Sequence, residues 1–159
     1  DTATTEIYTL SLHALFRSGA KISRNNINVD LVEENASVNL NTLFSPSEKL
    51  HIDNQLKIKH IGEKCESSLD YRGILKDQST GVFGGTVYVN QDAADTQSNM
   101  TNRNLVLSDH ARINTKPVLE IYNEDVQCTH SATSGRLDEE KLFYIQSRGI
   151  GESDRKSVV

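Results

Sequence analysis

The sequence predicts an all-β protein, in the form of a parallel β-helix, because apolar and polar residues alternate along many short stretches. This alternation is typical of half-buried strands, and the stretches often recur at intervals of about 10 residues, as in sandwiches, barrels and β-solenoids. The chain has no Asn-Gly or Asp-Gly dipeptide, which is the strongest signal of a two-residue hairpin. Short apolar stripes without tight hairpins favour stacked rungs that bury their stripes on one another. From periodicity alone, the β-helix is favoured only slightly over a β-sandwich.

The expected strands follow one another from the N-terminus, beginning with the alternating residues 7–15. The later strands are marked by alternating apolar positions: Ile27, Val29 and Leu31; Val38 and Leu40; Leu50 and Ile52; Leu56 and Ile58; Val87 and Val89; Leu105 and Leu107; Leu119 and Ile121. Polar turn residues separate these stretches, at positions 24–26, 45–47, 77–81, 90–92 and 108–109. Gly84 and Gly85 lie inside one stretch, where they could bend the strand.

The end of the chain changes character and predicts a single helix over residues 137–150. Asp138 is a good N-cap, and the acidic residues after it fall in the first turn, where the helix dipole favours negative charge. An apolar stripe that includes Leu142 gives the helix a face to bury. We therefore expect a β-helix core over residues 1–133 and the start of a truncated helical region over residues 134–159.

Composition and charge exclude several classes of protein. At 159 residues the chain is expected to form one domain with its own core. The formal net charge of −5 and the lack of Lys/Arg runs argue against a nucleic-acid surface. No apolar stretch approaches the ~18 residues that a membrane span requires. The two cysteines, Cys65 and Cys128, are too few for a disulfide framework and favour a reduced, intracellular setting.

Residues 125–133, DVQCTHSAT, hold the main candidate for chemistry. In a strand, Val126, Cys128 and His130 share one face, with successive Cα atoms about 6.6 Å apart. A thiol and an imidazole at this spacing could bind a soft or borderline metal together, or the histidine could help to deprotonate the thiol. Two ligands are too few for a closed structural site, so a second chain, a substrate or an inorganic ion would have to complete the shell. The alternative is that both residues simply pack, since free cysteine behaves as a small buried hydrophobe.

No enzyme motif is found elsewhere, and we do not expect an enzyme. Residues 81–85, GVFGG, lack the Gly-Lys-Ser/Thr ending of a phosphate loop. The chain also lacks Gly-x-Ser-x-Gly and His-Glu-x-x-His motifs. A sugar-active β-helix enzyme would need acidic residues clustered on one strand face, and none is convincingly placed there. Structural or surface roles are expected for the remaining histidines: His13, His51, His60 and His110.

Four segments carry a family resemblance: SSLDYRGIL, GVFGGTVYVNQDA, TNRNLVLSDHARINTKPVLEIYNEDVQCTHSAT and LDEEKLFYIQSRGI. Together, over residues 67–150, they resemble the SufB/SufD family, the scaffold subunits of the Suf iron–sulfur cluster assembly machine. TKPVLEIY and the Cys-x-His pair are similar to the SufD branch. Asn102 stands about where SufB carries a cysteine, and Thr129 and Ser131 stand where SufB carries glutamates. Ser131 also replaces a glycine usual in the family, which could alter the turn before the helix.

The resemblance implies a right-handed parallel β-helix with a helical C-terminal region. It also implies a SufB-like partner, joined through the last strands, and a SufC-like ATPase, bound mainly through the C-terminal helices. His130 and Cys128 match residues at the cluster-assembly interface, where His130 would be a transient metal ligand completed by the partner chain. The partner-strand interface would include Leu119, Ile121 and Val126, and its exposed edge could also pair two copies of an isolated fragment.

The expected function is a non-catalytic scaffold subunit of the Suf complex. No tightly bound cofactor is expected, only iron or an iron–sulfur cluster held transiently with the partner. The bacterial cytoplasm is the favoured location, with a plastid-type organelle as the alternative. The competing interpretation is a structural or adhesive β-solenoid without metal chemistry, in which a change at His130 would leave cluster assembly intact.

Overall fold

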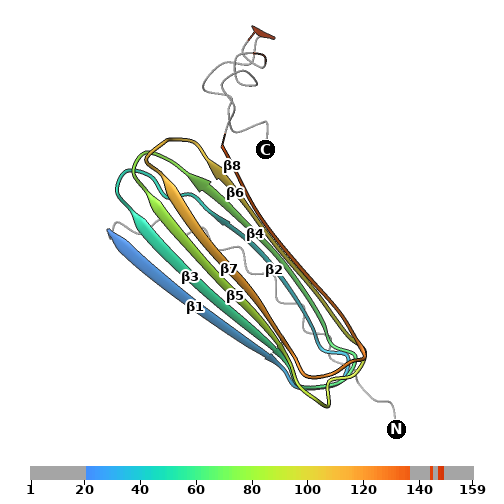
Figure 1. Ribbon diagram of the computed structural model, residues 1–159. Helices are drawn as coiled ribbons and strands as arrows, with labels where there is room; N and C mark the ends of the chain where they lie inside the picture. The colour runs from blue at the N-terminus through green and yellow to red at the C-terminus, as the bar shows by residue number, and fades with distance from the viewer. Residues whose placement is uncertain (1–20, 137–143, 145–146, 149–159) are drawn as a thin grey trace.

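A computed structural model describes residues 21–136, 144 and 147–148, and in this part the chain forms a parallel β-solenoid of four stacked rungs. The eight strands are, in chain order, β1 (Ile22–Leu31), β2 (Ser37–Phe44), β3 (His51–His60), β4 (Glu66–Leu75), β5 (Thr80–Val89), β6 (Thr96–Val106), β7 (Arg112–Ile121) and β8 (Val126–Arg136). Each rung takes one strand from each of two facing sheets (Figure 1). The predicted β-helix is confirmed, and the β-sandwich alternative is wrong.

Consecutive strands belong to opposite sheets. One sheet has the order β1-β3-β5-β7 and the other the order β2-β4-β6-β8, and all neighbouring strands run parallel. Ile22 lies opposite His51, and His51 lies opposite Thr80, so the chain returns to the same sheet once in each rung. Parallel pairing requires a crossover between the paired strands. Here the crossover is the strand of the facing sheet, which explains why the sequence needs no tight hairpins.

The core lies between the two sheets, where the alternating side chains of both walls meet. In β3 and β5, buried positions alternate strictly with partly exposed positions along the strand. Three aromatic rings pack in series: the ring centroids are 5.3 Å apart for Phe44 and Tyr71, and 4.5 Å apart for Tyr71 and Phe83. Because burying one large apolar side chain contributes about 1.5–3 kcal/mol, this series stabilises the contact between three consecutive rungs.

Five of the seven corners between the described strands contain a residue in the left-handed conformation. Five non-glycine residues of the described chain have a positive φ angle, all of them between strands: Asn35, Glu48, Lys64, Asp77 and Asp95. Asn and Asp adopt this conformation more readily than most residues. Backbone hydrogen bonds link the corners of adjacent rungs, as where the amide of Lys64 donates to the carbonyl oxygen of Ala94 at 2.8 Å. The corners therefore stack in the same order as the strands.

The turn predicted at residues 24–26 is wrong, because these residues lie inside β1. Asn25 faces the interior, and its side-chain amide donates to the side-chain oxygen of Asn54 in β3 at 2.8 Å. A polar residue can occupy an inward position when the neighbouring rung supplies a hydrogen-bond partner.

The bend considered at Gly84 and Gly85 is absent, because both residues lie within the continuous strand β5. A Cβ atom added to Gly85 would come within 2.7 Å of the Met100 sulfur, in the facing sheet. Glycine at this position therefore makes room for a large core side chain and does not mark a change of direction.

Two sequence predictions fall outside the described residues: the first strand, residues 7–15, and the C-terminal helix, residues 137–150, apart from Tyr144, Ser147 and Arg148. Within the described residues, no helix is long and apolar enough to cross a membrane.

Candidate functional site

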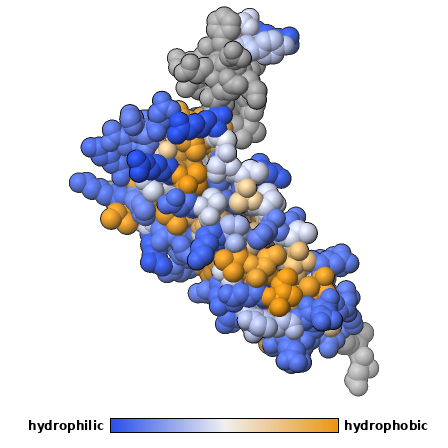
Figure 2. All heavy atoms as spheres, viewed as in Figure 1, coloured by the Kyte–Doolittle hydropathy of each residue, from blue (hydrophilic) through white to orange (hydrophobic). Residues whose placement is uncertain are grey.

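The fourth rung, formed by β7 and β8, is one of the two open ends of the described solenoid, and the first rung, formed by β1 and β2, is the other. β7 pairs with β5 and β8 pairs with β6, and in the described part of the chain neither has a strand on its other side. Their free edges carry backbone N–H and C=O groups that can pair with another strand. Figure 2 shows apolar side chains gathered in the region of these two strands. The fourth rung therefore combines unpaired backbone with an uncovered apolar surface.

The inner face of β8 carries Val126, Cys128 and His130, as their alternation predicts. Each lies beside a buried residue of β6, in the order Thr96, Ser98 and Met100. Cys128 is half-buried, whereas His130 is exposed because no further rung in the described residues covers it. The Cα atoms of Cys128 and His130 are thus about 6.6 Å apart, and both side chains project from the same solvent-accessible face of β8.

The thiol of Cys128 is protonated at neutral pH in this chain. Burial raises its pKa, and a backbone hydrogen bond with Ser98 opposes that shift only in part. Because the thiolate is the form that binds metals and acts as a nucleophile, Cys128 needs a cation or another chain beside it before it can react.

A buried row of polar side chains runs from Cys128 into the core. Ser98, which lies beside Cys128 in the register, shares a hydrogen bond with Ser67 of the next rung, with 2.8 Å between the two Oγ atoms. The Ser67 Oγ atom also lies 2.9 Å from Nε2 of His60. His60 is fully buried, and burial lowers its pKa to about 4, so its ring is neutral at physiological pH.

Sequence reasoning expected a structural or surface role for His60 but missed this buried row. The row recurs once in each of the second, third and fourth rungs, at Ser67, Ser98 and Cys128, whereas the first rung has Val38 at this position. A search for inward polar residues repeated at the rung spacing could have found it, whereas local alternation could not.

The described residues contain no group of three or more His, Cys, Asp or Glu side chains that could hold a metal ion together. Cys128 and His130 therefore offer two donors at most from this part of the chain. A closed tetrahedral site needs four ligands. Metal or cluster chemistry at this surface thus requires donors from outside the described solenoid.

The three residues predicted to line a partner-strand interface all lie on the inner face of the fourth rung. Leu119 and Ile121 of β7 lie opposite Val87 and Val89 of β5, which are fully buried. Leu119 and Val126 are half-buried against the core, whereas Ile121 is 39% exposed. These side chains form an apolar surface that one more layer of protein would cover.

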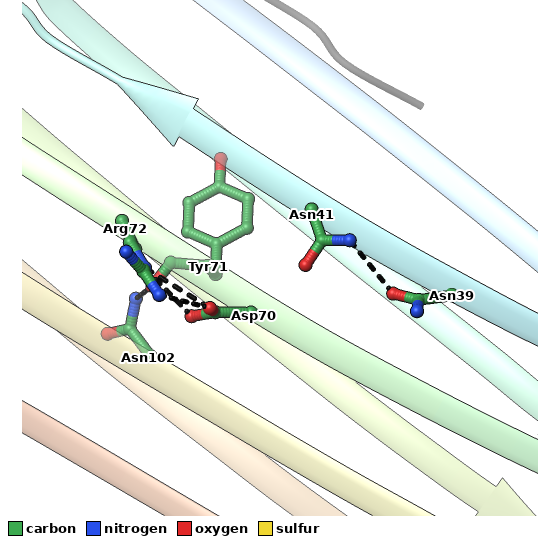
Figure 3. Close-up of polar contacts among 6 residues, drawn as sticks. All are labelled: Asn39, Asn41, Asp70, Tyr71, Arg72 and Asn102. Carbon is green, nitrogen blue, oxygen red and sulfur yellow. Dashed lines mark hydrogen bonds and ion pairs between the residues drawn. The ribbon is translucent and has the colours of Figure 1, made fainter. Parts of the chain in front are cut away.

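Asn102 stands at the position where the resemblance places a SufB cysteine, and its side chain forms hydrogen bonds inside the core. It is fully buried, its amide donates to the carbonyl oxygen of Tyr71 at 3.2 Å, and its side-chain oxygen accepts from Asn104 at 2.6 Å. Figure 3 shows Asn102 and Tyr71, together with the outward-facing pair of Asp70 and Arg72 on either side of Tyr71 in β4. This position therefore has a packing and hydrogen-bonding role in this chain.

Comparison with known proteins matches most of this chain to one family. The family model described as "SUF system FeS cluster assembly, SufBD core domain" matches residues 9–159. The iron–sulfur cluster assembly protein SufD of Escherichia coli is 37% identical over 144 residues, which cover 91% of this chain and 34% of that protein. An iron–sulfur cluster assembly SufBD family protein of Synechocystis is 34% identical over 141 residues, which cover 89% of this chain and 31% of that protein.

A plant protein is similar to the same degree. The chloroplastic protein ABCI7 of Arabidopsis thaliana is 32% identical over 144 residues, which cover 89% of this chain and 30% of that protein. The chain therefore spans about a third of the length of the curated relatives it matches.

Proposed function

This chain belongs to the SufBD core family of iron–sulfur cluster assembly proteins, and we propose that it is a non-catalytic scaffold subunit of the SufD type. Its fourth rung would form the cluster-assembly interface with a SufB-like partner. One observation carries the proposal: Cys128 and His130 share the inner face of a rung whose edge is unpaired in the described chain.

The partner would cover the fourth rung by adding its own strands to β7 and β8. Free strand edges template the pairing of another strand, and such pairing supplies main-chain hydrogen bonds while side chains give specificity. The apolar side chains of Leu119, Ile121 and Val126 would be buried by the contact. The same edge would allow an isolated chain to pair with a second copy of itself.

The cargo at this interface would be iron or a nascent iron–sulfur cluster, held by donors from both chains. The imidazole of His130 suits ferrous iron, and the thiolate of Cys128 suits the assembled cluster. Because the Cys128 thiol is protonated in the chain alone, binding of the cargo would release a proton. We expect no resident cofactor, since two donors do not make a closed site.

A SufC-like ATPase would be the third component, and its movement would open the seam between the two scaffold subunits. The bacterial cytoplasm is the proposed location, with a plastid-type organelle as the alternative, in keeping with relatives from a bacterium and from a chloroplast.

The decisive experiment is to express full-length His130→Ala together with its SufB-like and SufC-like partners in a strain that lacks its own Suf system. Recovery of an iron–sulfur enzyme and formation of the complex are measured separately. We expect an intact complex and at least about a 10-fold loss of recovery, because even the loss of a residue that only supports a metal ligand typically lowers metal affinity or activity about 10- to 100-fold.

Thr129→Ala is the matched control, because Thr129 is the neighbour of His130 on the outer face of β8. This variant should retain full recovery. Full recovery with His130→Ala would instead identify the chain as a purely structural β-solenoid at this position.

A further inference from the structure

A cavity of about 420 Å³, open to solvent, lies at the corner where β5 and β7 begin. Its lining residues are Gln78, Thr80, His110 and Arg112. Thr80 is the first residue of β5 and Arg112 is the first residue of β7. The cavity is on the outer surface of this sheet, so it is separate from the inner face that carries His130.

Alternation and register bring the four lining side chains together. Thr80 and Arg112 are partners in the register of β5 and β7, so their backbones are about 4.8 Å apart. Ser79 and Ala111, which precede them, are buried. Gln78 and His110 lie in the turns before β5 and β7, where both are exposed, and they line the same cavity as Thr80 and Arg112. The four side chains thus line one open cavity on the outer surface of the sheet.

The chemistry of this cavity is that of a hydrogen-bond donor site. All four side chains can donate a hydrogen bond and none is acidic. The guanidinium of Arg112 is charged at any physiological pH and presents its N–H groups as a planar fork. Among the described residues, the five ion pairs are formed by side chains other than these four, so Arg112 is in no ion pair there.

The acidic residues nearest in sequence are held by other donors. The carboxylate of Asp77 accepts the backbone amide of Glu48 at 2.8 Å, and the carboxylate of Asp109 lies 2.7 Å from the guanidinium of Arg136. The donors of Arg112 and Thr80 therefore remain available for a ligand that carries its own negative charge.

We propose that this cavity binds a small tetrahedral oxyanion, of which phosphate is the representative. Arg112 supplies the positive charge and a bidentate contact, which is the geometry that phosphate oxygens accept. The hydroxyl of Thr80, the amide of Gln78 and the ring of His110 supply further donors around the same group. The site is independent of the proposed scaffold function, because it uses neither the residues nor the face of the cluster-assembly interface.

A phosphorus NMR titration of the full-length protein with inorganic phosphate, at constant ionic strength, tests the proposal. We expect saturable broadening of the phosphate resonance with a Kd on the order of 1 mM, as for a few charge-assisted hydrogen bonds at an open site. Sulfate should compete at a similar concentration, whereas chloride should not. Arg112→Gln should weaken phosphate binding about 10-fold or more without changing the thermal unfolding temperature.

Arg103→Gln is the matched control, because Arg103 is an exposed arginine on the outer face of the other sheet. It should bind phosphate as the unmodified protein does. Thr80→Val is a second variant, which removes one donor without changing the charge and should weaken binding about 3-fold or more. Non-saturable binding, or equal affinity in the Arg112→Gln and Arg103→Gln proteins, would overturn the proposal and leave only a general attraction to surface cations.

Discussion

The third and fourth rungs of the solenoid follow the same alternating pattern, yet their inner faces differ. Val87 and Met100 of the third rung are fully buried. Their register neighbours in the fourth rung are Leu119, which is half-buried, and His130, which is exposed. The difference arises from position, because the third rung is covered on both sides and the fourth, in the described chain, on one. A stripe that completes a core in one rung is thus left uncovered in the next within the described residues.

The comparison extends to residues that can carry chemistry. His60 and His130 both occupy inward positions, but His60 is enclosed in the core and hydrogen-bonded to Ser67, whereas His130 is open to solvent. The enclosed histidine contributes to the structure in its neutral form, while the open one is available to a ligand. The same residue type is therefore buried or exposed according to the number of rungs that cover it.

The largest expected effect comes from breaking the core of the third rung. Phe83→Ala should lower the free energy of unfolding by about 3–5 kcal/mol, because the ring is fully buried and stacks on Tyr71. Urea denaturation monitored by circular dichroism measures the change. Leu119→Ala, in the fourth rung, should cost less than half as much in the same experiment. Equal costs in the two rungs would mean that the fourth rung is as well packed as the third.

A second, smaller effect concerns the enclosed histidine. His60 has a pKa lowered from 6.5 to about 4 by burial, so below pH 6.5 the unfolded chain binds a proton that the folded chain excludes. The stability that depends on neutral His60 is therefore complete above pH 6.5 and is lost as the pH falls towards 4. The loss should amount to about 3 kcal/mol, since one pKa unit corresponds to about 1.4 kcal/mol.

The measurement is the free energy of unfolding by urea at pH 7, 5.5 and 4.5, compared between the unmodified protein and His60→Gln. Glutamine keeps a hydrogen-bonding group near Ser67 but does not titrate, so the variant should lose less stability on acidification even if it is less stable at pH 7. Parallel pH profiles for the two proteins would contradict the role assigned to His60.

The smallest effect on folding is expected at the open surface. Ile121→Asp should change the free energy of unfolding by less than about 1 kcal/mol, because Ile121 is 39% exposed and loses little burial. Association with a SufB-like partner should fall strongly, since a charge would be placed in the contact. Sedimentation velocity of the full-length pair measures the association. Ile22→Asp, at an exposed apolar residue of the first rung, should leave association unchanged, and equal losses in both variants would argue against an interface at the fourth rung.

Alternating apolar residues predicted strands such as β5, but β4 was missed although Leu69 and Tyr71 point inward, and β6 was marked by Leu105, which faces outward. Val87 and Val89 mark β5 correctly because both of their side chains enter the core. Residues 24–26 could not be predicted in this way, because Asn25 faces inward and is satisfied by Asn54, a residue of the next rung. Local pattern does not reveal a partner that the register supplies.

In the candidate site, too, the features within one strand could be predicted from the sequence, whereas those that depend on contacts between rungs could not. The shared face of Cys128 and His130 follows from their spacing of two residues in a strand. The residues beneath Cys128, and the pairing of Thr80 with Arg112, depend on how strands from different rungs align. That alignment is set by the corners between the strands, whose lengths differ from rung to rung, so periodicity within a strand could not predict it.

Each described strand pairs with the strand two positions away in chain order, and this limits when the strands can pair during synthesis of the chain. As the polypeptide leaves the ribosome, the partner that the described residues provide for β1 is available only once β3 has emerged, and the partner for β2 only once β4 is complete at Leu75. Two adjacent rungs are therefore the smallest unit that can hold together, and later rungs add to it by contacts with their immediate neighbour. Non-local pairing is slow because distant segments must meet before any contact forms, so the nascent chain exposes unpaired strands until the second rung closes. Each new rung then protects the one before it, and among the described rungs the fourth is the last to emerge and the last to be covered.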